Sequence, residues 1–144
     1  YYTDEHLDEQ ATHPLYMLES DCWTAAESGP LADLVTYPNH FSWAVRFLIR
    51  YCRDRQLLPL EEVVRKMTSM PASKFGLKGR GQVAAGAVAD LAVFDLDRLE
   101  ERASYAQPRR YARGIDYVFV NGALTVEKDE HTGARAGKLL RRGT

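Results

Sequence analysis

The fold is decided by residues 15–21, which read Leu-Tyr-Met-Leu-Glu-Ser-Asp. The first four are apolar, follow Pro14, and are consistent with a buried strand, although periodicity alone does not separate such a strand from a buried helix. Residues 22–40 are predicted to form a long loop because they contain two turn-forming pairs, Gly29-Pro30 and Tyr37-Pro38. Loops of this length are often functional. Asp21 therefore stands at the start of a candidate site.

Residues on both sides of this loop show helical patterns. Residues 4–12 are polar and are consistent with the end of a helix. Apolar side chains recur three and four residues apart between Phe41 and Gln56, which predicts an amphipathic helix. A second helix is predicted to begin at Pro59, with acidic residues near its start and basic residues near its end, as the helix dipole favours. Pro71 is predicted to open a third helix that ends at Gly76.

Beyond Gly76 the pattern changes to short strands and turns. Residues 89–95, 117–120 and 123–126 are predicted strands. Asn121-Gly122 between the last two is a strong hairpin signal, because a type I′ turn needs positive φ at both central residues. Residues 137–140 are expected to add a last edge strand. The predicted organisation is helices followed by a small, mostly antiparallel sheet.

The composition is that of a globular chain of 144 residues, with 19 Lys and Arg against 20 Asp and Glu. This balance gives no long-range attraction toward nucleic acid, and no run of about 18 apolar residues predicts a membrane span. Cys22 and Cys52 form no CxxC pair, which favours a reducing, cytoplasmic compartment. The chain starts with Tyr1 rather than Met, so Tyr1 is not expected to be the natural start.

Several motifs occur in an order that points to one family. They are Ser20-Asp21, the helix 41–56, the segment 60–72, Phe75-Gly76-Leu77, Gly79-Arg80-Gly81, Ala89-Asp90-Leu91, Asn121-Gly122 and His131-Thr132-Gly133. This order resembles the C-terminal third of the D-aminoacylase, or N-acyl-D-amino-acid deacylase, group of the metal-dependent amidohydrolase superfamily. The resemblance covers nearly the whole chain.

The resemblance implies an α/β plus β fold that is incomplete on its own. Residues 1–76 would supply the end of a (β/α)8 TIM barrel, with residues 15–19 as its last strand. Residues 77–144 would be the C-terminal part of a composite β-sandwich. The implied partner is the N-terminal remainder of the enzyme, and the resemblance leaves a homo-oligomer open.

Asp21 is the catalytic residue that the resemblance implies. Working groups of barrel enzymes sit at the C-terminal ends of strands. The family's aspartate at this place acts as general base and then general acid on a metal-bound water, and is a candidate weak ligand of that divalent metal, expected to be zinc. The alternative is that Asp21 only caps a turn. The resemblance implies that the other ligands come from earlier strands, outside this chain. No two of the four histidines here have metal-ligand spacing.

Two further residues are candidate substrate contacts. Trp23 follows Asp21 closely and is a candidate pocket wall. Asn39 stands where D-aminoacylases carry an arginine that pairs with the substrate's carboxylate. Asparagine does not supply a charged bidentate fork, so the preferred interpretation of Asn39 is a cap for the helix that starts near Phe41.

The leading functional hypothesis is metal-dependent hydrolysis of the C–N amide bond of a small molecule. One alternative is a cyclic amidohydrolase of the hydantoinase or dihydroorotase kind. Another is a non-catalytic structural module, which has no need of Ser20-Asp21.

Overall fold

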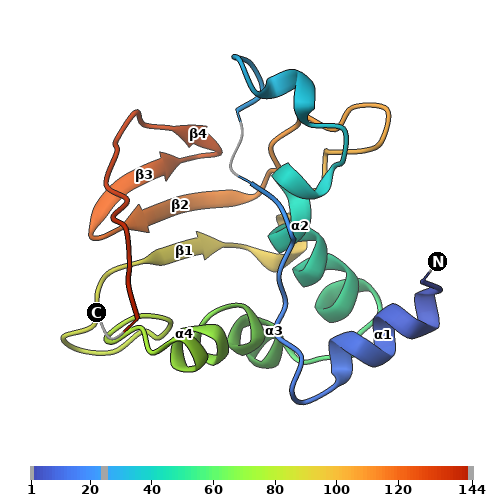
Figure 1. Ribbon diagram of the computed structural model, residues 1–144, viewed down its shortest axis with the longest axis horizontal. Helices are drawn as coiled ribbons and strands as arrows, with labels where there is room; N and C mark the ends of the chain where they lie inside the picture. Colours follow the sequence, from blue (N-terminus) through green and yellow to red (C-terminus); the bar gives the residue numbers. More distant parts are fainter. Residues whose placement is uncertain (1, 24–25, 143–144) are drawn as a thin grey trace.

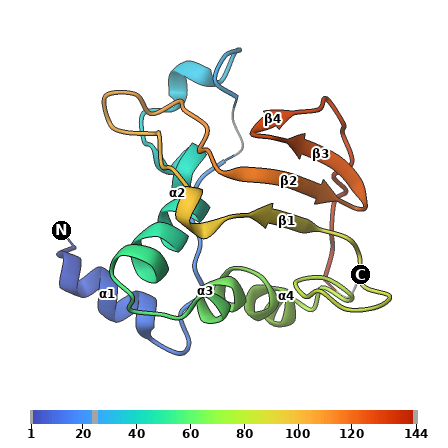
Figure 2. The same ribbon diagram turned by 180° about the vertical axis from the view of Figure 1, so that it is seen from behind.

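A computed structural model describes residues 2–23 and 26–142, so Tyr1 lies outside the described part. The helical elements are α1 (Asp4–Thr12), the 3-10 helix η1 (Ala32–Leu34), α2 (Asn39–Phe47), the π-helix η2 (Leu48–Asp54), α3 (Leu60–Met67) and α4 (Ser69–Phe75). After them come β1 (Leu91–Phe94), the 3-10 helix η3 (Leu96–Arg98), β2 (Ile115–Val120), β3 (Ala123–Glu127) and β4 (Glu130–His131). The sheet lies on one side of α2 and α1 on the other, in both views of the molecule (Figures 1 and 2).

The predicted helices are present, with shifted ends. The helix predicted over 41–56 is α2 continuing into η2, and it begins at Asn39. Pro59 precedes α3 as its N-cap instead of opening it. Pro71 is the third residue of α4, which ends as predicted at Gly76 in the left-handed conformation, with φ 69°. Local signals therefore identify these helices to within about two residues, as is usual for helix ends.

The sheet is antiparallel in the order β1-β2-β3-β4. Asn121 and Gly122 have φ of 49° and 81°, so the predicted hairpin turn is confirmed. The edge strand predicted over 137–140 is wrong, because these residues form no strand. A second tight turn at Lys128 and Asp129, with φ of 49° and 69°, returns the chain at once, and β4 occupies the free edge of β3.

Residues 15–19 are not a strand in this structure. A strand needs a neighbouring strand, and the four strands of the described part pair only with one another. The segment instead lies along α3, where the Leu18 N–H donates to the Lys66 carbonyl at 3.2 Å. The Lys66 ammonium donates to the carbonyls of His13 at 2.5 Å and Tyr16 at 2.9 Å, with the Lys66 residue fully buried. Burial lowers the pKa of Lys66 from its ordinary value.

One hydrophobic core joins the helical half to the sheet. Its buried members include Leu18, Leu48, Tyr51 and Val63 from the helical half, and Leu99 from the segment after η3. Phe94 and Ile115 of the sheet pack against this core. The chain from the end of β1 to Leu99 is therefore packed against the helices.

Candidate functional site

Asp21 directly follows residues 16–20, which form neither helix nor strand. Its φ is 50°, an uncommon value for a residue other than glycine. The Asp21 N–H donates to the carboxylate of Glu19 at 2.7 Å, so Glu19 closes this turn. The Asp21 side chain is exposed, and in the part of the chain that the structure describes no hydrogen bond or ion pair engages its carboxylate. The turn therefore leaves the Asp21 carboxylate free for chemistry.

A shallow pocket of about 400 Å³ surrounds Asp21. Its lining comprises Glu19, Ser20, Asp21, Cys22, Trp23 and Trp43. The Cys22 thiol donates to the Ser20 carbonyl at 3.1 Å. Trp23 is 50% exposed, and its ring meets the His40 ring edge to face, with centroids 4.4 Å apart. The structure thus brings the predicted pair Asp21 and Trp23 to one pocket.

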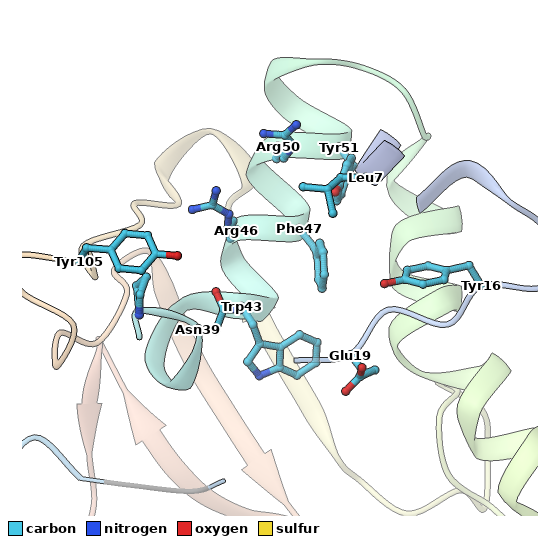
Figure 3. A pocket seen from close by; sticks show the side chains of 11 residues that line it. Leu7, Tyr16, Glu19, Asn39, Trp43, Arg46, Phe47, Arg50, Tyr51 and Tyr105 are labelled. Atoms are coloured by element: carbon cyan, nitrogen blue, oxygen red, sulfur yellow. The ribbon is translucent and has the colours of Figure 1, made fainter. Parts of the chain in front are cut away.

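Asn39 lines a second pocket of about 270 Å³ (Figure 3). This pocket adjoins the first, because Glu19 and Trp43 line both. Asn39 is the first residue of α2, whose N-cap is Pro38 without a side-chain capping bond. The interpretation of Asn39 as the helix cap is therefore wrong. The helix starts two residues earlier than the apolar periodicity suggested, which places Asn39 inside it.

Sequence reasoning missed Arg46 and Tyr105, which line the same pocket as Asn39 (Figure 3). Arg46 lies two helical turns after Asn39 on α2, a spacing that places both on one face. Tyr105 comes from the segment between η3 and β2, and no local pattern in the sequence links it to Asn39. Only the fold brings these two residues together.

The described residues contain no group of three His, Cys, Asp or Glu side chains suited to a metal ion. Each of the four histidines has a ring nitrogen in hydrogen-bond contact with nearby backbone, as recorded for His6, His13, His40 and His131. Asp21 and Cys22 are neighbours but do not make a complete ligand set. The described residues therefore form no complete ligand set around Asp21.

No helix of the described residues is both long enough and apolar enough to cross a membrane. Cys22 and Cys52 are both free thiols.

Comparisons with known proteins agree on one family. The sequence profile of the amidohydrolase family matches residues 12–126. D-aminoacylase from Alcaligenes xylosoxydans xylosoxydans is 43% identical over 106 residues, covering 74% of this chain and 22% of that protein. N-acyl-D-glutamate deacylase from the same organism is 37% identical over 136 residues, covering 94% of this chain and 27% of that protein.

A solved structure gives the same result. The crystal structure of N-acyl-D-glutamate deacylase from Bordetella bronchiseptica, complexed with zinc and a phosphonate inhibitor, matches with a TM-score of 0.82 and 33% identity. The match covers 96% of this chain and 28% of that one. This chain therefore spans about a quarter of the length of these relatives. On the family profile, which matches most of its residues, the chain belongs to the amidohydrolase family.

Proposed function

We propose that this chain is the C-terminal part of a deacylase that hydrolyses the C–N amide bond of N-acylated amino acids. The observation that carries this proposal is the free carboxylate of Asp21, a residue that lines a pocket, while the Glu19 carboxylate accepts the N–H of the turn. A residue whose only role is to cap a turn would itself accept the turn's N–H. The relatives with broad coverage of this chain are deacylases, which supports the reaction class.

Asp21 would move the proton in this reaction. Amide hydrolysis needs a deprotonated water for attack and a protonated nitrogen for departure. The Asp21 carboxylate would accept the proton of the attacking water and then give it to the leaving nitrogen. A divalent metal, zinc by analogy with the Bordetella enzyme, would supply a water of lowered pKa. Its other ligands would come from the part of the enzyme outside this chain.

The proposed architecture places residues 1–76 at the end of a (β/α)8 barrel and residues 77–144 in a composite β-sandwich. Two features support the barrel part. Residues 16–19 form neither helix nor strand and pair with no strand in the described part, and Leu15 is 78% exposed. Tyr16, Trp43 and Phe47 line an open pocket beside this segment, as expected of a surface that further strands would cover (Figure 3). The free thiols Cys22 and Cys52 support a cytoplasmic location.

The test of the proposed function is hydrolysis by the full-length enzyme. The substrates are the N-acetyl derivatives of D-glutamate, D-aspartate and D-leucine, their L-enantiomers, and the cyclic amides hydantoin and dihydroorotate. Release of acetate from an N-acetyl amino acid is the expected result. Hydrolysis confined to the cyclic amides would contradict the proposal in favour of a cyclic amidohydrolase. No turnover of any of them with zinc present would favour a structural module.

Replacing Asn39 by alanine is expected to change the free energy of unfolding by less than about 0.5 kcal/mol, because an exposed helix residue without a capping bond contributes little. The matched variant is Ser42→Ala on the same helix. The Ser42 hydroxyl is buried and shares its one proton between the Pro38 carbonyl at 3.0 Å and the Glu101 carboxylate at 3.1 Å, so its loss should cost about 1–3 kcal/mol. Urea denaturation measures both. If Asn39→Ala lowers the free energy of unfolding by about 1 kcal/mol or more, Asn39 does cap the helix. If it raises KM at unchanged stability, Asn39 is a substrate contact.

A further inference from the structure

Residues 101–112 project from the sheet as an arm between η3 and β2. Paired backbone bonds close its base, since the N–H of each of Glu100 and Arg113 donates to the carbonyl of the other at 3.0 Å. Leu99, just before the arm, is buried in the core, and its carbonyl accepts from Arg53 at 2.8 Å. The arm is therefore built on a fixed base. In both ribbon views it reaches beside η1 and the start of α2 (Figures 1 and 2).

The arm contacts the loop that follows Asp21 at several points. Arg109 pairs with Asp33 at 2.7 Å, and the Tyr111 N–H donates to the Glu27 carboxylate at 3.4 Å. Two edge-to-face ring contacts add to these: Tyr105 meets Tyr37 of the loop at 6.3 Å, and Tyr111 meets Phe41 of α2 at 4.9 Å. Asp33 is 96% exposed, so its ion pair contributes little. The strongest link lies elsewhere in the arm.

Glu101 makes that link. One oxygen of its carboxylate accepts from the Arg46 guanidinium and from the Ser42 hydroxyl, each at 3.1 Å, and the hydroxyl shares its one proton with the Pro38 carbonyl at 3.0 Å. The Ser42 residue is only 1% exposed, and the Glu101 side chain 22% exposed. Hydrogen bonds to a charged group are stronger than neutral ones. The bond from the buried Ser42 is shielded from water, which strengthens it further. The Arg46 side chain is 47% exposed, so its ion pair adds less. Glu101 thus fixes the first turns of α2, the helix that carries Asn39 and Trp43.

The arm also reaches the pocket itself. Tyr105 lines the cavity formed with Asn39 and Arg46, which adjoins the Asp21 pocket through Glu19 and Trp43 (Figure 3). We propose that the arm is a specificity-determining element of the deacylase, in which Glu101 positions α2 and Tyr105 forms a wall around the amino-acid side chain of the substrate. This inference rests on the proposed function. Asp21 lies on a separate segment and keeps its own turn, so the arm governs which substrate binds, not the proton transfer.

The test measures kcat and KM of the full-length enzyme for N-acetyl-D-glutamate, N-acetyl-D-aspartate and N-acetyl-D-leucine. Glu101→Ala should raise KM for the best substrate about tenfold and leave kcat within about threefold, which is the pattern of lost binding. Glu101→Asp should restore most of the loss, because a carboxylate remains. The matched control is Glu100→Ala, since the exposed Glu100 side chain makes no hydrogen bond or ion pair in the described structure. It should behave as wild type.

Tyr105→Ala provides a second, independent variant. Tyr105 is 78% exposed, so folding does not depend on it. Its removal should change the ranking of the three substrates by kcat/KM. An unchanged ranking in Tyr105→Ala, or equal losses of kcat for all substrates in Glu101→Ala without rescue by Glu101→Asp, would overturn the role of the arm. A wild-type enzyme that turns over none of the three would instead overturn the proposed function, and the inference with it.

Discussion

Asp21→Asn in the full-length enzyme is expected to lower kcat by about 10³-fold, within the range of general acid–base catalysis. The amide keeps the size of the carboxylate but neither accepts nor returns the proton. The fold should persist for two reasons. The Asp21 side chain is exposed and makes no bond in the described structure, and asparagine tolerates the positive φ of this position as well as aspartate does. The melting temperature should therefore stay within about 2–4 °C of the wild type.

Glu19→Gln is the matched control for this prediction. The side-chain oxygen of the glutamine still accepts from the Asp21 N–H, so the turn is retained. The substitution removes only the negative charge of residue 19. We expect kcat within about tenfold of wild type, equivalent to about 1.4 kcal/mol in the barrier. Steady-state kinetics and thermal melting of both variants make the comparison. Activity of Asp21→Asn within that same tenfold would exclude proton transfer by Asp21 and favour a non-catalytic role for this chain.

The features that the sequence predicted well depend on residues close together in the chain. The helices α2, α3 and α4 follow from apolar spacing and from terminal residues such as Gly76. The β2–β3 hairpin follows from Asn121-Gly122, whose turn requires positive φ. Each of these signals acts within a few residues, which is the range over which propensity and turn chemistry decide the backbone.

The features that the sequence did not predict depend on distant partners. Residues 15–19 have the composition of a strand, but a strand exists only beside another, and Lys66 ties this segment to α3 instead. A lysine on an amphipathic helix is normally expected at the surface. Glu101 lies 55 and 59 residues from its partners Arg46 and Ser42, so no local pattern indicated that contact. The sequence did not predict Tyr105 in the pocket either, because Tyr105 is distant in the sequence from the other lining residues.

The second large effect is expected on removing the metal. The proposed reaction depends on a divalent ion, yet the described part of this chain offers no group of three suitable ligands, and its histidine rings contact nearby backbone. Dialysis of the full-length enzyme against a chelator should abolish deacylation, and added zinc should restore it. In the proposed site the other ligands come from outside this chain, so the separately expressed 144-residue chain should bind no stoichiometric zinc.

Mass spectrometry measures the zinc content of the full-length enzyme, and calorimetric titration measures zinc binding by the separate chain. The full-length enzyme should carry at least about one zinc per molecule, as a metal-dependent hydrolase requires. Asp21→Asn in that enzyme should retain most of its zinc, because a weak ligand contributes less affinity than histidine ligands held by an outer shell of hydrogen bonds. One tightly bound zinc on the separate chain would place the ligands within it and contradict the proposed division of the site. Full activity after chelation, with no metal left by mass spectrometry, would remove the metal from the mechanism and leave Asp21 to act on an unassisted water.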